Sequence, residues 1–441
     1  MTMSTALLTD HYELTMLQAA LASGAAGRRT VFEVFARHLP GGRRYGVVAG
    51  TGRVLDALER FRFGPDEIEF LRGNQVVNDE TLAFLARYRF TGDVYGYREG
   101  DCYFPGSPIM VVESTFAEAV VLETLILSIL NHDSAIASAA SRMVQAAGTR
   151  PIIEMGARRT HEWAGVAAAR AAYLAGFAST SNLMAGRVYG VPTAGTAAHA
   201  FTLVHDSERD AFRAQLGSLG TATTLLVDTY EVRPAVQTAV ELTGGELGAV
   251  RIDSGDLAVA AEEVRQLLDD LGAPRTRIVV TSDLDEYAIA ALAAAPVDGY
   301  GVGTSLVTGS GAPTASMVYK LVAREDDHGV IRPVAKRSVG KPSRGGRKEA
   351  FRLLDGDGTA ISEIITTATS VDQWPTGRRL LAPLIKNGEV VGREPLADAR
   401  ERHRAVIAEL PPAALHLSRG DPAVPTIFEG NIGSAPRGAA P

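Results

Sequence analysis

The stretch VPTAGTAAHAF at residues 191–201 surrounds a single histidine, His199, with small residues. Gly195, Thr196 and two alanines precede it, and no charged or aromatic residue stands between Val191 and the ring. An imidazole changes its charge near neutral pH and offers two ring nitrogens, so it can accept a proton or another transferred group. A single histidine can equally be a hydrogen-bonded core residue, and the residue types alone leave both interpretations open.

Two carboxylates and an arginine stand where short apolar runs end. In AVRIDSGDL, residues 249–257, Arg251 and Asp253 close an expected strand. An arginine can hold a carboxylate or phosphate through its planar fork, and an aspartate can stabilise a cationic transition state or bind a ribose hydroxyl. An ion pair beside a helix cap is the alternative for both. Asp228 ends LLVDTY and is the kind of carboxylate that fixes the orientation and tautomer of an imidazole.

Two more segments carry polar groups at expected strand ends. Arg158 lies in MGARRTHEWAG, between a strand and a helix, and Ser181 lies in STSN. Paired arginines are usually solvated surface charge, but this position lets one of them face a pocket. The hydroxyl of Ser181 is suited either to helix capping or to a ligand contact.

A glycine-rich run, YGVGTSLVTGSG at residues 300–311, follows another short strand. Gly301 and Gly303 would let backbone amides approach an anion, and the helix expected after Thr304 would add its positive end. This pattern predicts a phosphate site or a plain tight turn. Its place after the last strand of a barrel-like series favours phosphate.

A basic segment, IRPVAKRSVGKPSRGGRK at residues 331–348, contains Lys336 and six other Lys or Arg residues. No aromatic residue interleaves these charges, as base stacking on single-stranded nucleic acid would require. A solvated loop and a mobile cover over a polyphosphate remain the two interpretations.

The N-terminal segment LLTDHYELTM, residues 7–16, contains Tyr12. It predicts either a buried helix start capped by Thr9 or Asp10, or an aromatic platform for a flat ring.

The elements that must position these residues fall into two patterns. From residue 151, short apolar strands alternate with helices such as 256–272, which predicts a parallel sheet with seven strands and an active site at their carboxyl ends. Around this region the pattern is mixed. The segments are a strand at 30–37, helices near 51–60, 65–72 and 79–88, strands within 92–114, a long buried helix at 116–147, three strand-like stretches after 315 and a helix at 396–410.

The predicted fold class is therefore α/β. We expect an irregular TIM-like α/β barrel over about 131–319, and a second, discontinuous, mainly-β or α+β N-terminal domain over 1–130 plus about 320–441. The strands after 315 would return to this N-terminal domain. The tail after about 420, which is rich in Gly, Pro and Ala, is expected to be loosely held.

Composition excludes several classes of protein. At 441 residues with 46% apolar content, the chain exceeds one ordinary core, and its net charge of −7 argues against a nucleic-acid binder. A single cysteine, Cys102, excludes a disulfide framework and a four-cysteine zinc site and fits a reducing cytoplasm. No secretory signal is visible, and the apolar stretch 117–130 is interrupted by Glu123 and too short to span a bilayer, so no membrane association is expected.

In this order, the motifs LLTDHYELTM, VFEVFAR, EMGARRTHE, STSN, VPTAGTAAHAF, RIDSGDL and GVGTSL resemble those of nicotinate phosphoribosyltransferase, a type II phosphoribosyltransferase family. The resemblance covers roughly residues 7–350. It implies that nicotinate is coupled to phosphoribosyl pyrophosphate, giving nicotinate mononucleotide and pyrophosphate in cytoplasmic NAD salvage. It also implies ATP as a co-substrate, Mg²⁺ beside the pyrophosphate, and a head-to-tail homodimer with shared sites.

The resemblance also implies roles for individual residues. His199 matches the histidine that accepts the γ-phosphoryl group of ATP, and Asp228 would hold its other ring nitrogen. Asp253 matches a carboxylate that faces the ribose. Tyr12 matches the aromatic residue that stacks on the nicotinate ring and reaches the partner subunit's site. Arg158 and Arg251 match residues that line the pyridine and ribose-phosphate pocket. The 5′-phosphate loop is matched by Gly301, Gly303 and Thr304, and the groups near pyrophosphate and the ATP phosphates are matched by Arg37 and Lys336.

Ser181 favours nicotinate over nicotinamide. In nicotinamide-using relatives an aspartate matches this position and would repel a carboxylate, whereas a serine hydroxyl can donate to one. The alternatives are a nicotinamide- or quinolinate-using phosphoribosyltransferase, a non-catalytic nucleotide sensor, and a nucleic-acid binder that uses the basic segment.

Overall fold

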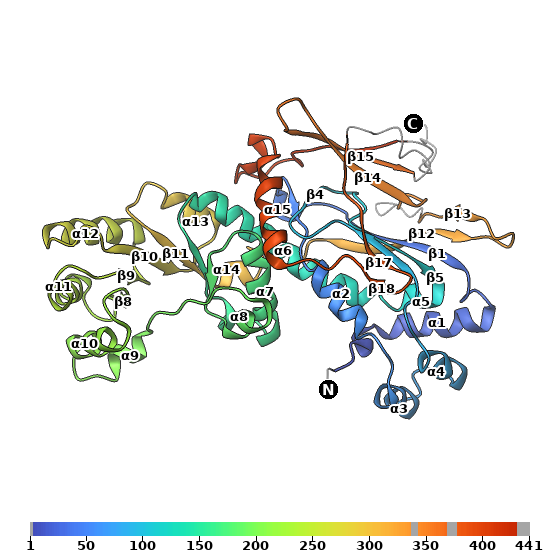
Figure 1. The fold of residues 1–441 in the computed structure, drawn as a ribbon, viewed down its shortest axis with the longest axis horizontal. Helices are drawn as coiled ribbons and strands as arrows, with labels where there is room; N and C mark the ends of the chain where they lie inside the picture. Colours follow the sequence, from blue (N-terminus) through green and yellow to red (C-terminus); the bar gives the residue numbers. More distant parts are fainter. Residues whose placement is uncertain (1–2, 337–342, 368–376, 430–441) are drawn as a thin grey trace, which may run out of the picture. The chain divides into compact units, whose positions relative to one another are not determined.

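The computed structural model describes residues 3–336, 343–367 and 377–429. The chain divides into two compact units (Figure 1). Unit 1 comprises Met1–Ser138 and Thr314–Pro441, and unit 2 comprises Ala139–Pro313. Unit 1 is therefore discontinuous in sequence, and the first boundary falls inside the long helix α6 (Glu123–Ala147).

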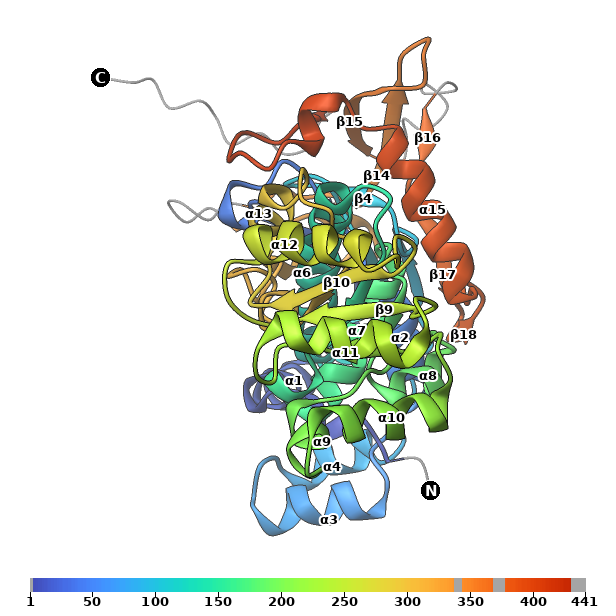
Figure 2. The same cartoon turned by 90° about the vertical axis from the view of Figure 1, so that its left-hand side faces the viewer.

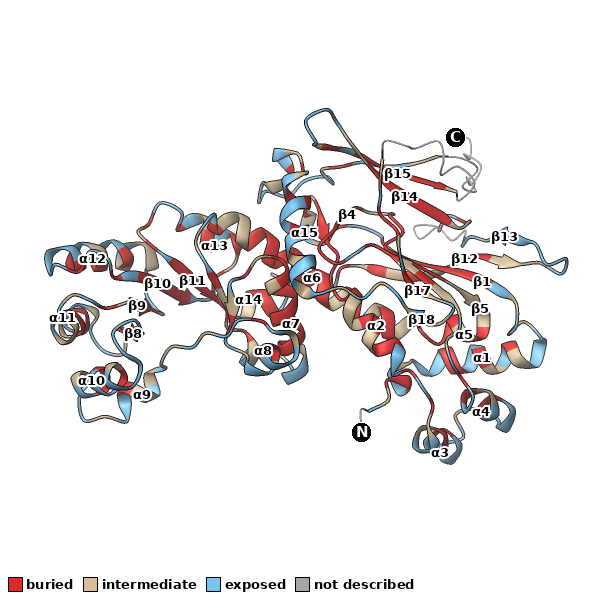
Figure 3. Cartoon of the chain, viewed as in Figure 1, coloured by how far each residue is buried: buried red, intermediate tan, exposed pale blue. Residues whose placement is uncertain are grey.

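The main sheet of unit 1 is antiparallel and is built around β1 (Arg29–Ala36). Strand β1 lies between β5 (Met110–Thr115) and β12 (Met317–Glu325), with Phe32 opposite Leu321. Because β12 comes from the second half of the chain, the expected return of the segments after 315 to the first domain is confirmed. Most residues of β1 are buried (Figure 3), which accounts for their apolar, β-branched and aromatic character.

The other elements of unit 1 complete this sheet, form two smaller sheets and pack around them. The strands are β2 (Gly46–Val47), β3 (Asp93–Gly96), β4 (Cys102–Tyr103), β13 (Ile331–Pro333), β14 (Lys348–Leu354), β15 (Ala360–Thr367), β16 (Arg378–Arg379), β17 (Ala382–Lys386), β18 (Glu389–Val390) and β19 (Thr426–Phe428). The helices are α1 (His11–Ser23), α2 (Thr51–Glu59), α3 (Pro65–Gly73), α4 (Asp79–Leu85), α5 (Phe116–Val120) and α15 (Leu396–Ala408).

The prediction of a single helix over 116–147 is wrong, because the helix is interrupted between α5 and α6. The Thr9 hydroxyl lies 2.5 Å from the Glu13 carboxylate and 3.0 Å from the carbonyl of Val121, so its one proton is shared between these two acceptors. The buried Glu13 carboxylate accepts the backbone amide of Thr124 at 2.9 Å, in the first turn of α6. Glu13 therefore does for α6 what a local capping residue would do, and this contact comes from a distant part of the sequence.

Unit 2 contains a six-stranded sheet in which every strand pairing is parallel, in the order β7-β6-β11-β10-β9-β8. Its strands are β6 (Ile152–Glu154), β7 (Ser179–Thr180), β8 (Thr224–Leu226), β9 (Ala249–Ile252), β10 (Arg277–Ser282) and β11 (Gly299–Val302). Its helices are α7 (Glu162–Leu174), α8 (Leu183–Tyr189), α9 (His199–Leu203), α10 (Glu208–Leu219), α11 (Val232–Thr243), α12 (Leu257–Asp270), α13 (Glu286–Ala291) and α14 (Thr304–Val307).

The parallel sheet with helical crossovers confirms the TIM-like α/β prediction (Figure 2). Helix α12 connects β9 to β10 and packs on both strands. One of the seven expected strands, VPTAGTAAH, does not form. Among the described residues, its only sheet contact is a single bridge between Thr193 and Thr180. Pro192 cannot donate to a strand ladder, and glycine at 195 disfavours extended pairing, which explains the difference.

No helix within the described ranges is both long enough and apolar enough to cross a membrane.

Candidate functional site

The carboxyl ends of four adjacent strands in unit 2 surround a pocket of about 190 Å³. Parallel strands all end at one edge of a sheet, so residues far apart in sequence meet there. The lining residues are Met155, Arg158, Arg159, Arg251, Asp253, Thr281, Ser282, Asp283, Gly301, Gly303 and Thr304. Six of the predicted site residues are therefore brought together: Arg158, Arg251, Asp253, Gly301, Gly303 and Thr304.

Arg251 is the buried cation of this pocket, with 8% of its surface exposed. Its Nη1 donates to the hydroxyl of Thr196 and, at 3.1 Å, to the carbonyl of Ala197. Its Nη2 lies 3.7 Å from Oδ1 of Asp253. Burial lowers the pKa of the guanidinium from its usual value, but an arginine still holds its proton at neutral pH. It therefore presents a fixed positive charge to an anion in the pocket.

Asp253 is held in place by its neighbours. Its Oδ1 accepts a hydrogen bond from the Thr281 hydroxyl on the adjacent strand β10. Its Oδ2 lies 3.9 Å from Nε2 of His199. The side chain is 31% exposed, so the carboxylate is fixed on one side and open to the pocket on the other.

His199 begins helix α9, and its side chain is 41% exposed. Its Nδ1 lies 3.1 Å from the hydroxyl of Thr229, and its Nε2 faces Asp253. A side chain built on Gly195 would meet nothing within 4 Å. His199 is therefore not a buried core residue, and Gly195, four residues before it, has room for a side chain.

The expected pairing of Asp228 with His199 is not among the contacts of the described residues. Oδ2 of Asp228 instead accepts the backbone amide of Asp253 at 2.7 Å and the hydroxyl of Ser254 at 2.8 Å. The contact to His199 comes from Thr229, the next residue. The reason is the direction in which the backbone leaves β8: the Asp228 side chain points along the sheet edge toward the end of β9. Asp228 thus anchors the segment that carries Asp253.

Close packing requires glycine at two positions here, Gly301 within β11 and Gly156 after β6. A Cβ on Gly301 would lie 2.5 Å from Cγ2 of Thr281 and 2.8 Å from the sulfur of Met155. Gly303 caps α14, and the carbonyl of Gly303 would be 2.9 Å from a Cβ on Gly156. The glycine-rich run therefore brings backbone close to the pocket wall, as the phosphate interpretation requires.

Ser181 follows β7 and is exposed. Its amide donates to the carbonyl of Glu154 at 2.8 Å, and its neighbour Asn182 caps α8 by accepting the amide of Ala185 at 3.0 Å. The capping role in STSN thus belongs to Asn182, and the hydroxyl of Ser181 is left for other contacts.

Three predicted residues lie in unit 1. Tyr12 is 44% exposed on α1, and burial of its hydroxyl end together with nearby Glu123 raises its pKa, so the phenol stays neutral. The expected cap of this helix is not made by a side chain: the Thr9 hydroxyl instead donates to Glu13 at 2.5 Å. Lys336 pairs through its backbone with Ser343, as donor at 2.9 Å and as acceptor at 3.1 Å.

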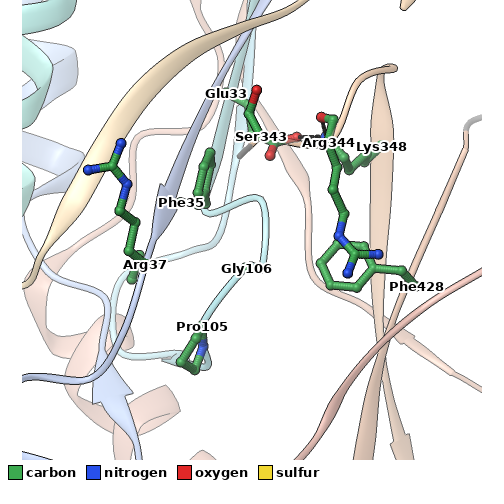
Figure 4. A pocket seen from close by; sticks show the side chains of 10 residues that line it. Glu33, Phe35, Arg37, Pro105, Gly106, Ser343, Arg344, Lys348 and Phe428 are labelled. Atoms are coloured by element: carbon green, nitrogen blue, oxygen red, sulfur yellow. Dashed lines mark hydrogen bonds and ion pairs between the residues drawn. The ribbon is translucent and has the colours of Figure 1, made fainter. Parts of the chain in front are cut away.

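Arg37 lines a separate pocket of about 280 Å³ in unit 1 (Figure 4). Arg344 lies at the other side of this pocket with its guanidinium carbon 3.7 Å from the centre of the Phe428 ring. A buried pair, Lys348 donating to Glu33 at 2.8 Å, closes one end. Residues 337–342 of the basic segment lie outside the described residues, so the prediction of a cover over a polyphosphate stays a prediction.

Sequence reasoning missed Thr281, Thr196, Thr229 and Met155. Thr281 and Thr196 hold Asp253 and Arg251, Thr229 contacts His199, and Met155 forms the wall behind Gly301. A signal existed for two of them: Thr281 ends the apolar run at 278–280, and Thr229 follows the chosen residue Asp228. Nothing in the sequence distinguished these three threonines from threonines that face solvent.

Comparison with known proteins identifies the family. A family model described as the nicotinate phosphoribosyltransferase (NAPRTase) N-terminal domain matches residues 7–131. The protein named nicotinate phosphoribosyltransferase pncB1 of Mycobacterium tuberculosis is 58% identical over 429 residues, covering 95% of this chain and 94% of the relative. The chain belongs to the nicotinate phosphoribosyltransferase family. The resemblance carried by the motifs is thereby confirmed, and the chain is an enzyme.

Solved structures agree with this family. The crystal structure of human nicotinic acid phosphoribosyltransferase has a TM-score of 0.80 at 26% identity and covers 96% of this chain and 98% of its own. A nicotinate-nucleotide pyrophosphorylase from Pyrococcus furiosus has a TM-score of 0.75 at 26% identity, covering 93% and 95%. Both structures therefore share the fold over nearly the whole of this chain.

We predict that Gly301→Ala lowers kcat/KM for phosphoribosyl transfer at least tenfold. The new methyl group would displace Thr281 or Met155, and Thr281 holds Asp253. Steady-state kinetics on the folded variant measures this. Gly217→Ala in α10 is the matched control, because a Cβ there meets nothing within 4 Å and alanine suits a helix interior. Equal kinetics for Gly301→Ala and the wild type would contradict the assignment of this strand end to the active site.

Proposed function

We propose that this chain couples nicotinate to phosphoribosyl pyrophosphate at the carboxyl edge of the unit 2 sheet, releasing nicotinate mononucleotide and pyrophosphate in cytoplasmic NAD salvage. The observation that carries this location is the convergence of Arg251, Asp253 and the loop Gly301–Thr304 on one pocket. The names of the relatives support the choice of reaction.

In the proposed reaction the pyridine nitrogen attacks C1 of the ribose while the bond from C1 to the pyrophosphate oxygen breaks. The nitrogen lone pair is the nucleophile, so no general base is needed. Positive charge develops on the ribose ring in the transition state, and the Asp253 carboxylate is the group proposed to stabilise it. The Thr281 hydrogen bond keeps that carboxylate oriented before the reaction begins.

The 5′-phosphate is proposed to bind the loop that carries Gly301, Gly303 and Thr304. Backbone amides at the start of α14 would donate to its oxygens. Arg251 would contact the ribose phosphate side, and Arg158 the pyridine side. We propose that Arg37 and Lys336 of unit 1 contact pyrophosphate and ATP phosphates.

The donor set fits a magnesium ion that is held mainly by substrate. No group of three or more potential metal ligands occurs among the described residues, but Mg²⁺ typically needs one or two carboxylates plus phosphate oxygens and waters. Asp253 and Asp283 line the pocket, and Oδ1 of the neighbouring Asp228 is buried without a hydrogen-bond partner. Asp253 and Asp283 would hold the ion, which neutralises charge on the leaving pyrophosphate.

ATP hydrolysis is proposed to accompany turnover through a phosphohistidine at His199. The γ-phosphoryl group would pass from ATP to a ring nitrogen, with ADP as the leaving group, and then to water. As placed, one ring nitrogen contacts Thr229 and the other faces Asp253. To accept the phosphoryl group, the ring would give up one of these two contacts.

The direct test is a turnover assay of the purified chain with phosphoribosyl pyrophosphate and nicotinate, nicotinamide or quinolinate, with and without ATP. We expect nicotinate mononucleotide from nicotinate, and faster formation with ATP. Preference for another base would contradict the proposed substrate, and absence of pyrophosphate release with all three bases would favour the sensor alternative.

We predict that His199→Asn abolishes ATP hydrolysis but leaves ATP-independent formation of nicotinate mononucleotide. Asparagine is similar in polarity and cannot carry the phosphoryl group, and the imidazole takes no part in the attack on the ribose. Phosphate release from ATP and product formation are measured in parallel. Normal ATP hydrolysis by this variant would show that His199 is not the acceptor.

We predict that Ser181→Asp lowers the ratio of kcat/KM for nicotinate to that for nicotinamide at least tenfold. Two negative charges about 4 Å apart repel by about 1 kcal/mol in water and about 4 kcal/mol near a protein surface, and each ~1.4 kcal/mol is one decade. Nicotinamide can donate its NH₂ to the new carboxylate. Ser181→Asn, which adds bulk without charge, is the control. A ratio within twofold of the wild type would mean that residue 181 does not face the carboxylate.

The exposure of Tyr12 supports a proposed homodimer in which this ring stacks on nicotinate in the partner's site. We predict that Tyr12→Ala and Asp253→Ala are each inactive alone and regain part of the activity after mixing and subunit exchange. A tagged pull-down shows whether mixed dimers have formed. Mixed dimers without recovered turnover would contradict shared sites.

A further inference from the structure

Glu154 is a fully buried carboxylate that the proposed reaction does not use. It ends β6 in the same unit as the pocket, and no Lys or Arg of the described residues is among the groups that shift its pKa. Burial raises its pKa, and only hydrogen bonds from Thr180 and Gly156 oppose that shift. A buried carboxyl group without a cation costs stability. Its presence here therefore needs a reason other than stabilising the core.

The contacts of Glu154 join two strand ends. Its Oε1 accepts the amide of Gly156, at the start of the segment that carries Arg158. Its Oε2 accepts the buried hydroxyl of Thr180, the last residue of β7. Its backbone carbonyl accepts the amide of Ser181 at 2.8 Å. We assign Arg158 and Ser181 to the base pocket. Arg158 lies two residues after Gly156, Ser181 lies one residue after Thr180, and the Glu154 side chain binds both Gly156 and Thr180.

Thr180 extends the connection to a third segment. Its amide donates to the carbonyl of Pro192 at 2.9 Å, and its carbonyl accepts the amide of Ala194 at 3.0 Å. Its hydroxyl oxygen also accepts the amide of Asn182 at 2.9 Å. The hydroxyl has a single proton, so donating to Glu154 while accepting from Asn182 fixes its orientation. An alcohol is required at this position, and valine, although similar in shape, could do neither.

We propose that Glu154 and Thr180 are positioning residues that set the spacing between the Arg158 and Ser181 segments, and that this spacing determines how tightly and how selectively the pyridine base is bound. This inference rests on the proposed function. On the ribose and phosphate side, Thr281 holds Asp253, and Gly301 packs against Thr281 and Met155; the side chains of Glu154 and Thr180 take no part in these contacts. Loss of the Glu154–Thr180 contact therefore loosens the base side of the pocket and leaves the phosphoribosyl side in place.

The test compares Thr180→Val with Thr180→Ser. Thr180→Val removes the hydroxyl, whereas Thr180→Ser keeps the hydroxyl and removes the methyl group. We expect Thr180→Val to raise KM for nicotinate at least tenfold and to lower the nicotinate-to-nicotinamide preference at least fivefold. KM for phosphoribosyl pyrophosphate should stay within threefold, and Thr180→Ser should stay within threefold of the wild type in all constants.

Glu286→Gln is the control for a general loss of stability. Glu286 is a second buried carboxylate of unit 2, 2% exposed, that pairs with Arg142 and accepts the Ser310 hydroxyl. Its loss should lower the melting temperature without changing base preference. If Thr180→Val does not fold, Glu154→Gln takes its place in the test. The glutamine amide keeps one acceptor oxygen for the Gly156 amide and loses the second oxygen, which accepts the Thr180 hydroxyl. We expect at least a fivefold rise in KM for nicotinate.

Three outcomes would overturn the proposal. These are unchanged base kinetics in folded Thr180→Val, an equal rise in the KM of both substrates, and a loss of preference in Glu286→Gln matching that of the Glu154 or Thr180 variants. Failure of the proposed function is distinguishable, because it appears in the wild-type enzyme as no product from nicotinate before any variant is made.

Discussion

The geometry of the candidate site depends on the register of the parallel strands in unit 2. Thr281 on β10 pairs with Gly301 on β11, and Val302 pairs with Glu154 on β6. Side chains alternate between the two faces of a strand, so a slip of one residue would send every chosen group to the opposite face. All residues of β9 and β11 are buried, and Gly301 has no room for a side chain against Thr281, so a slip would also place a larger residue at this contact. The core therefore specifies where the chemistry can occur.

At the strand ends the charged side chains form one network of hydrogen bonds and ion pairs. Asp228 accepts the amide of Asp253, the Asp253 carboxylate accepts from Thr281, and it lies near both Arg251 and His199. Removing water from a cation and an anion is costly unless each has partners, and here backbone and hydroxyl groups provide them. The arrangement leaves Asp253 partly open to the pocket. A carboxylate that is oriented before substrate arrives needs little reorganisation during reaction.

Sequence patterns located the strands of unit 2, and the residue types at their ends located the pocket, because parallel strands must end on one edge. They did not predict which side chain reaches which partner. Asp228 was expected to contact His199, but the direction of its side chain depends on how the backbone turns after β8, and Thr229 makes that contact. The break between α5 and α6 depends on Glu13 and Thr9, which are distant in sequence. Such contacts carry no local signal.

Choice of base is the property least visible in the fold. The human and Pyrococcus furiosus structures both superpose on nearly the whole chain, so the fold is common to proteins with 26% identity to it. In the proposed reaction, the phosphate loop and the ribose carboxylate at this sheet edge serve whatever base is bound. Discrimination between a carboxylate and an amide must then come from a few donors at the far end of the pyridine pocket, and from what holds them. One hydroxyl such as that of Ser181 can favour an anion only if its position is fixed to a fraction of an ångström. A short strand of two residues, Ser179–Thr180, cannot supply that rigidity through its ladder alone. The buried hydrogen bonds of Glu154 supply it from beneath, which explains why a carboxyl group is kept where burial opposes its charge.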